Sequence, residues 1–190
     1  MLFTSIFSTI SIIEDRREGF LQSVTVAPIP RSSIVLGKIL GGTILSLLQA
    51  VILLLLIPFI GISLDLVSFL VVVVTLLIVA FGLTGLGFLI AWRMDSTQGF
   101  HAIMNLFLIP LWLLSGALFP ASGAAGWLHV VMQLNPLTYG LAALREGLYM
   151  HGHIVIKELS PLPLSILVIV TFAALMFIAC VVAVRRVRNS

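Results

Sequence analysis

Three long stretches of the sequence contain no charged residue, and they constrain the fold more than any other feature. They cover residues 39–62, 66–92 and 160–184. A helix needs about 20 consecutive apolar residues to cross the hydrocarbon core of a bilayer, and each stretch exceeds that length. The whole chain is 61% hydrophobic and only 9% charged, whereas soluble domains carry roughly 25% charged residues. We therefore expect an all-α, polytopic helical membrane protein with a single transmembrane domain over residues 1–190.

A fourth stretch, residues 96–144, contains no Asp, Glu, Lys or Arg and is too long for one span. Prolines and glycines interrupt it at 120–126, and Asn135-Pro136 interrupts it again. We expect one span followed by two short helices, near 125–134 and 137–150, in an external re-entrant hairpin. A hairpin lying flat at the membrane surface is the alternative. The predicted elements are a partial span at 1–13, full spans at 34–60, 66–92, 99–119 and 161–184, and the hairpin at 120–150.

Basic residues are distributed unequally between the two sets of connections. The first set carries eight of them, namely Arg16, Arg17, Arg31, Lys38, Arg93, Arg185, Arg186 and Arg188. The opposite set carries only Arg145 and Lys157. Because cytoplasmic loops have an excess of Lys and Arg, we expect the first set and the C-terminus to be cytoplasmic.

Residues 14–31 lie between two membrane segments and have a pattern of their own. The segment starts with the charge cluster Glu14, Asp15, Arg16, Arg17 and Glu18, followed by Gly19. Phe20, Val24 and Ala27 then recur at helical spacing, with Leu21 beside them. Prolines at 28 and 30 end this pattern, and Ser32 or Ser33 is expected to cap the next helix. The pattern predicts a short amphipathic helix that docks a partner at the cytoplasmic surface, and an ordinary charged loop is the alternative.

Small residues inside the spans predict close helix packing. Gly37 and Gly41 form a G-x-x-x-G pattern, and Gly82 and Gly85 belong to a second patch of small residues. Such patches let two helices approach closely in a membrane.

No pattern in the sequence predicts a catalytic, cofactor or metal site. The phosphate-binding loop G-x-x-x-x-G-K-[ST] is absent, because Gly37-Lys38 is followed by Ile39. His151 and His153 are expected to be solvated loop residues, since two ligands alone make a poor metal site. No long basic run suggests a nucleic-acid partner.

Three segments together resemble the ABC-2 permease family, particularly its drug-exporter branch, which includes daunorubicin-resistance permeases. The first runs from Glu14 through Ala27-Pro28-Ile29-Pro30-Arg31 to Gly37-Lys38 and is similar to the coupling-helix region of the family. The second is the stretch 114–120, Leu-Ser-Gly-Ala-Leu-Phe-Pro, at the end of a span. The third lies in the external hairpin and contains Asn135, Pro136, Tyr139, Arg145 and Glu146.

The resemblance implies the permease subunit of an ATP-binding cassette exporter in the bacterial cytoplasmic membrane. Such a subunit needs no cofactor, pairs with a second permease, here expected as a homodimer in membrane lipid, and uses ATP hydrolysed by a separate cytoplasmic ATPase. Phe20, Leu21 and Val24 would fill a groove of the ATPase, and the charges at 14–18 would set the register. The substrate would be a drug, a lipid or a glycan-like molecule. Because the family has six spans, we expect the first to be missing here and the second to be shortened.

Two alternatives remain open at this point. An intramembrane lipid-modifying enzyme would need a catalytic carboxylate or histidine at membrane depth, and all seven carboxylates fall in predicted connections. A structural or assembly subunit without transport activity is the other alternative.

Overall fold

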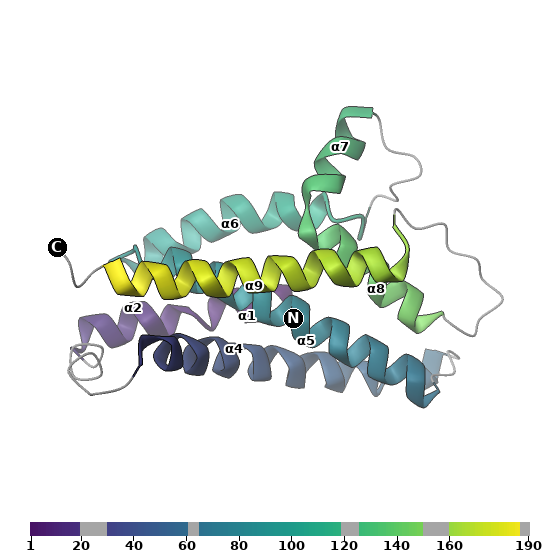
Figure 1. Cartoon of the computed structure of the whole chain (residues 1–190), viewed down its shortest axis with the longest axis horizontal. Coiled ribbons are helices and arrows are strands. Elements are labelled where there is room, and N and C mark those ends of the chain that lie inside the picture. Colours follow the sequence, from purple (N-terminus) through teal and green to yellow (C-terminus); the bar gives the residue numbers. More distant parts are fainter. Residues whose placement is uncertain (20–29, 61–64, 119–125, 150–159, 187–190) are drawn as a thin grey trace.

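The computed structural model describes residues 1–19, 30–60, 65–118, 126–149 and 160–186. Within these ranges the chain forms helices joined by turns, with no strand, which confirms the all-α prediction for the described part. In chain order the helices are α1 (Leu2–Phe7), α2 (Ile10–Arg17), α4 (Arg31–Leu54), the short 3₁₀ helix η1 (Ile57–Ile60), α5 (Leu66–Ala91), α6 (Thr97–Leu113), α7 (Gly126–Leu134), α8 (Pro136–Leu148) and α9 (Leu162–Arg186). Figure 1 shows α4, α5 and α9 running along the long axis of the molecule.

Three helices of the described part are long and apolar enough to cross a membrane. They are α4, continued through η1, together with α5 and α9, and they match the spans predicted at 34–60, 66–92 and 161–184. The start of α4 differs from the prediction, because Pro30 is its N-cap and Ser32 and Ser33 lie in its first turn. Asp65 caps α5 by accepting a hydrogen bond from the backbone N–H of Ser68.

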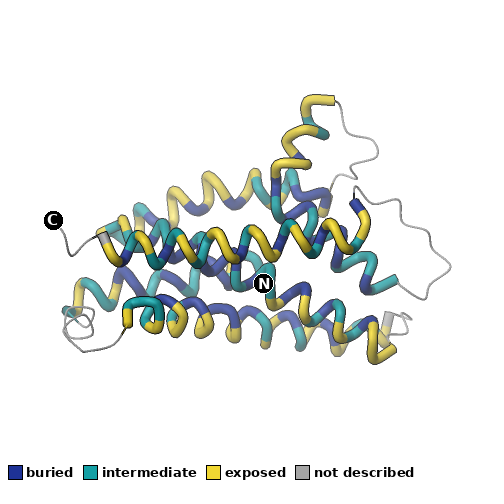
Figure 2. The backbone as a smooth tube through the Cα atoms, in the orientation of Figure 1, coloured by how far each residue is buried: buried dark blue, intermediate teal, exposed yellow. Residues whose placement is uncertain are grey.

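Helix α5 lies at the centre of the bundle. It contacts α1, α4, α8 and α9, and Figure 2 shows buried residues along much of its length. Its side chains Leu83 and Phe88 belong to the largest apolar cluster, which also includes Ile6, Ile12, Ile13, Val35, Ile39, Phe100, Met104, Leu108 and Cys180. The cluster therefore draws on helices from both ends of the sequence.

The partial span predicted at 1–13 consists of two helices, α1 and α2, with a break at Ser8 and Thr9. Hydroxyl groups in this region bond to the carbonyls three residues before them: Ser8 to Ser5, Thr9 to Ile6 and Ser11 to Ser8. Ser and Thr side chains that bond backward in this way bend or interrupt helices. The second helix, α2, continues through Arg17, so four of the five predicted cluster charges are helical.

Helix α6 is shorter than the span predicted at 99–119. It ends at Leu113, and Gly116 adopts a positive φ of 89° that turns the chain away. The prediction extended the helix too far because residues 114–118 are apolar or small and contain no proline. The 17 residues of α6 give a length of about 26 Å, slightly less than the roughly 30 Å of a bilayer core.

The two short helices of the predicted hairpin are α7 and α8, close to the expected 125–134 and 137–150. Helix α8 packs between α5 and α9, whereas α7 makes its main contact with α8. In Figure 1, α7 projects from the bundle across the direction of the long helices. The two arms of the hairpin are thus placed differently, with one built into the bundle and the other beside it.

Candidate functional site

One end of the bundle, here called the basic end, gathers Arg16, Arg17, Arg31, Lys38 and Arg93. Arg16 makes the most contacts there. Its guanidinium donates to the carbonyl of Trp92, to that of Met94 (3.4 Å) and to the Asp95 carboxylate (3.2 Å). It also lies 5.2 Å from the centre of the Trp92 ring, within the range of a cation–π interaction. Arg16 therefore holds the end of α2 against the end of α5.

Two further contacts tie the neighbouring helices together at the basic end. Lys38 of α4 forms an ion pair with Asp15 of α2, and both side chains are largely shielded from solvent. Arg31, the first residue of α4, donates to the Val184 carbonyl near the end of α9 at 2.6 Å. The last carbonyls of a helix have no partner within the helix, and cations are favoured beside them.

The charge cluster predicted to dock an ATPase is thus divided. Asp15 and Arg16 face other helices of the same chain, while Glu14, Arg17 and Glu18 are exposed. Arg17 donates to the Asp95 carbonyl at 3.1 Å, and Gly19 has the positive φ of 76° that glycine adopts easily. Phe20, Leu21 and Val24 lie outside the described residues, as do His151 and His153.

The opposite end of the bundle, here called the hairpin end, is the one that carries α7 and α8. Asn135 caps α8 by accepting from the Leu137 N–H at 3.0 Å and donates to the Leu111 carbonyl of α6 at 2.7 Å. Thr138 donates to the Leu114 carbonyl at 3.5 Å, and Arg145 to the Gly116 carbonyl at 3.1 Å. Three side chains, from the N-cap, the first turn and the last turn of α8, therefore bond the carbonyls left free where α6 ends.

The other hairpin residues singled out from the sequence have local roles. Pro136 is the first residue of α8, a position where its missing N–H costs nothing. The Tyr139 hydroxyl donates to the Gln133 carbonyl at 2.9 Å, which joins α8 to α7. Glu146 is half-buried.

The predicted packing glycines fall into two groups. A methyl group added at Gly82 would lie 2.8 Å from the Phe172 ring, and one at Gly85 would lie 3.0 Å from Met176, so both lie in close contact with α9. Gly37 and Gly41 are exposed and have no atom within 4 Å of that position. Among the described residues, no helix packs closely against these two glycines, in contrast to the prediction. The glycine of α4 that is packed within the chain is Gly42, against Ser8 and Thr84.

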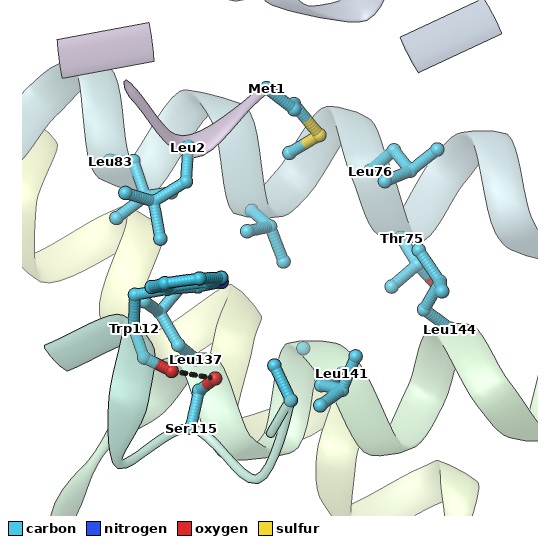
Figure 3. A pocket seen from close by; sticks show the side chains of 13 residues that line it. Met1, Leu2, Thr75, Leu76, Leu83, Trp112, Ser115, Leu137, Leu141 and Leu144 are labelled. Carbon is cyan, nitrogen blue, oxygen red and sulfur yellow. Dashed lines mark hydrogen bonds between the residues drawn. The ribbon is translucent and has the colours of Figure 1, made fainter. Parts of the chain in front are cut away.

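A cavity of about 170 Å³ lies between α1, α5, α6 and α8. Figure 3 shows Met1 and Leu2 on one side of it and Trp112 and Ser115 on another. Its lining is almost entirely apolar. The buried Thr75 hydroxyl, which lines the cavity, has no hydrogen-bond partner, whereas Ser115 donates to the Trp112 carbonyl at 2.6 Å.

Sequence reasoning missed the partners at both ends of the bundle. It singled out Arg16 and Asn135 but did not connect them with Trp92 or Leu111. It predicted no contact within the bundle for Arg31, Lys38 or Thr138. A weak signal was present, because Trp92 and Val184 end long apolar runs and so mark helix ends that need donors. Among the described residues, no three His, Cys, Asp or Glu side chains gather as a metal site would require.

Comparison with known proteins gives the family. Residues 1–149 match the ABC-2 type transporter family. The chain is 32% identical over 78% of its length to a putative transport permease, ycf38, from Cyanophora paradoxa, covering 51% of that protein. It is 30% identical over 70% of its length to a probable multidrug ABC transporter permease, YbhR, from Escherichia coli K12, covering 36% of it.

A further relative, the putative transport permease ycf38 of Porphyra purpurea, is 30% identical over 73% of the chain, and the match covers 48% of that protein. The chain thus spans about half the length, or less, of the curated relatives it matches. No solved structure matches it. The family match covers most of the chain, and three helices are able to cross a membrane. The chain is therefore a multi-pass membrane protein that belongs to the ABC-2 type transporter family.

Proposed function

We propose that this chain is the membrane-spanning permease part of an ABC exporter that uses ATP hydrolysed by a separate cytoplasmic ATPase. The family match supports this proposal most strongly, and the name of the Escherichia coli relative, a probable multidrug ABC transporter permease, agrees with it. The substrate is a drug, a lipid or a glycan-like molecule. Two permease subunits pair in the membrane, and α6 serves as a fourth span beside α4, α5 and α9.

In this proposal the basic end faces the cytoplasm of a bacterial cell. The positive charge of that end supports the orientation, because translocated loops are poor in Lys and Arg. Cysteines introduced at Ser122 and Ser190 then lie on opposite sides of the membrane. An impermeant thiol reagent added outside intact cells should label the first and spare the second, and equal labelling of both would refute the orientation.

The ATPase docks on the segment between α2 and α4, which the sequence predicts to contain an amphipathic helix. Replacing Phe20 and Val24 together with Asp puts two charges at an apolar contact, and each costs several kcal/mol when it stays unpaired. The ATPase should no longer co-purify with the permease. The matched control is Gln22→Asp with Thr25→Asp, which adds the same charge to the polar side of the segment.

The measurement is the amount of ATPase recovered per permease from detergent-solubilised membranes, using the permease as its gene encodes it. Permease abundance is measured in the same sample, so that loss of the complex is distinguished from loss of the protein. The proposal expects the double Phe20/Val24 variant to lose the ATPase and the control to keep it. Full recovery with both variants would show that the segment is an ordinary charged loop.

A further inference from the structure

The contacts at the basic end connect α2 and α4 with the ends of two other helices. These two helices flank the predicted coupling helix, since α2 ends at Arg17 and α4 begins at Arg31. We propose that Arg16 and Arg31 are positioning residues that transmit movement from this flank to α5 and α9 separately. The inference rests on the proposed function, because it takes an ATPase as the source of the movement.

Arg16 is suited to hold the end of α5 because its guanidinium presents several donors in one rigid plane. Two of its bonds go to the carbonyls of Trp92 and Met94, and a third goes to the Asp95 side chain. The Trp92 ring lies under the guanidinium and stacks on Phe88 of α5, with ring centres 5.6 Å apart. When α2 moves, these bonds therefore move the last turn of α5 with it.

Arg31 makes the corresponding contact to α9. It stands at the first position of α4 and bonds the carbonyl of Val184. The Val184 side chain is buried, so this turn of α9 is fixed in the bundle and responds to a pull from α4. Arg16 and Arg31 thus reach different helices from opposite sides of the predicted coupling helix.

The Asp15–Lys38 ion pair joins α2 to α4 directly, without α5 or α9. It keeps the two flanking helices at one separation, so that they move as a unit. With this pair intact, removal of Arg16 takes away the bonds to the carbonyls of Trp92 and Met94, while Arg17 still bonds the Asp95 carbonyl. Removal of Arg31 takes away the bond to α9 and leaves these contacts in place. The proposal therefore predicts separate effects for the loss of Arg16 and of Arg31. A general stabilising role of positive charge at the membrane surface predicts the same effect for both.

Arg93 provides a control for a general effect of positive charge at the membrane surface. It is exposed and lies between Trp92 and Met94, whose carbonyls Arg16 binds. Arg93→Gln removes one positive charge beside the Trp92 and Met94 carbonyls without changing the side chain that binds them. A role for charge alone predicts equal effects of Arg93→Gln and Arg16→Gln, whereas the proposal predicts none for Arg93→Gln.

The test uses the assembled complex of permease and ATPase in lipid nanodiscs. Amide hydrogen exchange is measured by mass spectrometry with and without ATP and orthovanadate, which trap the ATPases closed. In the wild type, trapping should change exchange in residues 88–95 of α5 and in residues 180–186 of α9. A charge-assisted hydrogen bond shifts an equilibrium by about tenfold, so losing one should remove most of the change at its own helix.

The expected result is that each variant loses the exchange response of a different helix. Arg16→Gln should lose the response at residues 88–95 and keep it at 180–186, while Arg31→Gln should do the reverse. Arg16→Lys, which keeps the charge but not the planar fork, should retain only part of the α5 response. Equal responses in wild type, Arg16→Gln and Arg31→Gln would overturn the proposal, as would loss of both responses in either variant.

Failure of the underlying function looks different in the same experiment. If the wild-type permease binds no ATPase, or trapping changes exchange nowhere in it, the exporter proposal fails and the inference fails with it. ATPase recovery per permease is recorded for every variant. Recovery should stay at the wild-type level in Arg31→Gln, because Arg31 contacts α9 of its own chain. The exchange response of Arg16→Gln is expressed per ATPase recovered, because Arg16 also belongs to the charge cluster expected to set the register of the ATPase.

Discussion

The basic end and the hairpin end both bind the free carbonyls of helix ends, but they do so with different chemistry. At the basic end the donors are the long cationic side chains of Arg16, Arg17 and Arg31, which are exposed or only half-buried. At the hairpin end two of the three donors are short and neutral, and Asn135 and Thr138 are buried with 5% exposure each. Exposed ionic contacts are weak and are screened by salt, whereas a buried carbonyl that loses its donor is costly.

This difference indicates that the two ends serve different purposes. The hairpin end fixes α8 to α6 and tolerates little change. The basic end joins α2 and α4 to α5 and α9 through cationic contacts that solvent and salt can reach. Under the proposed function, such an arrangement suits a permease that changes shape at the side facing its ATPase. The following predictions are ordered by the expected size of the effect.

Asn135→Ala should cause the largest loss of stability. It leaves the Leu111 carbonyl without a donor, at a cost of about 1–3 kcal/mol, and removes the cap of α8, at about 1 kcal/mol. The midpoint of thermal unfolding in detergent, followed by loss of monodisperse protein, measures the effect. Gln133→Ala removes an exposed amide nearby and should leave the midpoint unchanged. Asn135→Ser keeps a capping oxygen but not the amide donor to Leu111, and it should fall between them. A wild-type midpoint for Asn135→Ala would contradict the comparison.

Lys38→Glu should have an intermediate effect. It places a carboxylate beside Asp15 in a partly shielded site, and we expect a loss on the order of 1 kcal/mol. The charge-exchanged double variant, Asp15→Lys with Lys38→Asp, should recover more than half of that loss in the same thermal assay. Glu14→Lys, at an exposed position of α2, serves as the control. A double variant no more stable than Lys38→Glu would show that the ion pair does not hold α2 to α4.

Raising the ionic strength should have the smallest effect and should separate the two ends without any mutation. Between about 0.01 M and 1 M salt, the Debye length falls from roughly 30 Å to 3 Å. Amide exchange should accelerate in residues 90–95, where Arg16 and Arg17 bind, and stay constant in residues 111–114, where Asn135 and Thr138 bind. Equal acceleration at both ends would remove the distinction drawn between them.

The sequence predicts the apolar helices well because their signal is local. The span at 66–92 agrees with α5 to within one residue, since an N-capping Asp65 and a charged Arg93 mark its two ends. Helix α6 ends before the predicted boundary at 119, because the chain turns at Gly116 and side chains of α8 bond the carbonyls there. Local patterns do not contain such contacts, which join residues 24 to 29 positions apart in the chain.

The sequence does not predict the polar contacts of the basic end, for the same reason. Arg16 and the Trp92 carbonyl are 76 residues apart, and Arg31 and the Val184 carbonyl are 153 residues apart. The glycines show a related limit. Gly41 and Gly42 are neighbours in one small-residue patch, yet only Gly42 faces the bundle, because the position of α1 decides which side of α4 is covered.

The close fit of α9 against α5 also has a consequence for the time course of synthesis. Gly85 and its partner Cys180, which donates to the Gly85 carbonyl at 3.1 Å, are 95 residues apart in the chain. A ribosome adding about 5–20 residues per second needs about 5–19 s to make that stretch. Until then the side of α5 that carries Gly82 and Gly85 lacks the helix that packs most closely against it. Lipid or the insertion machinery must cover it, and the newborn protein is open to wrong helix pairing for that interval.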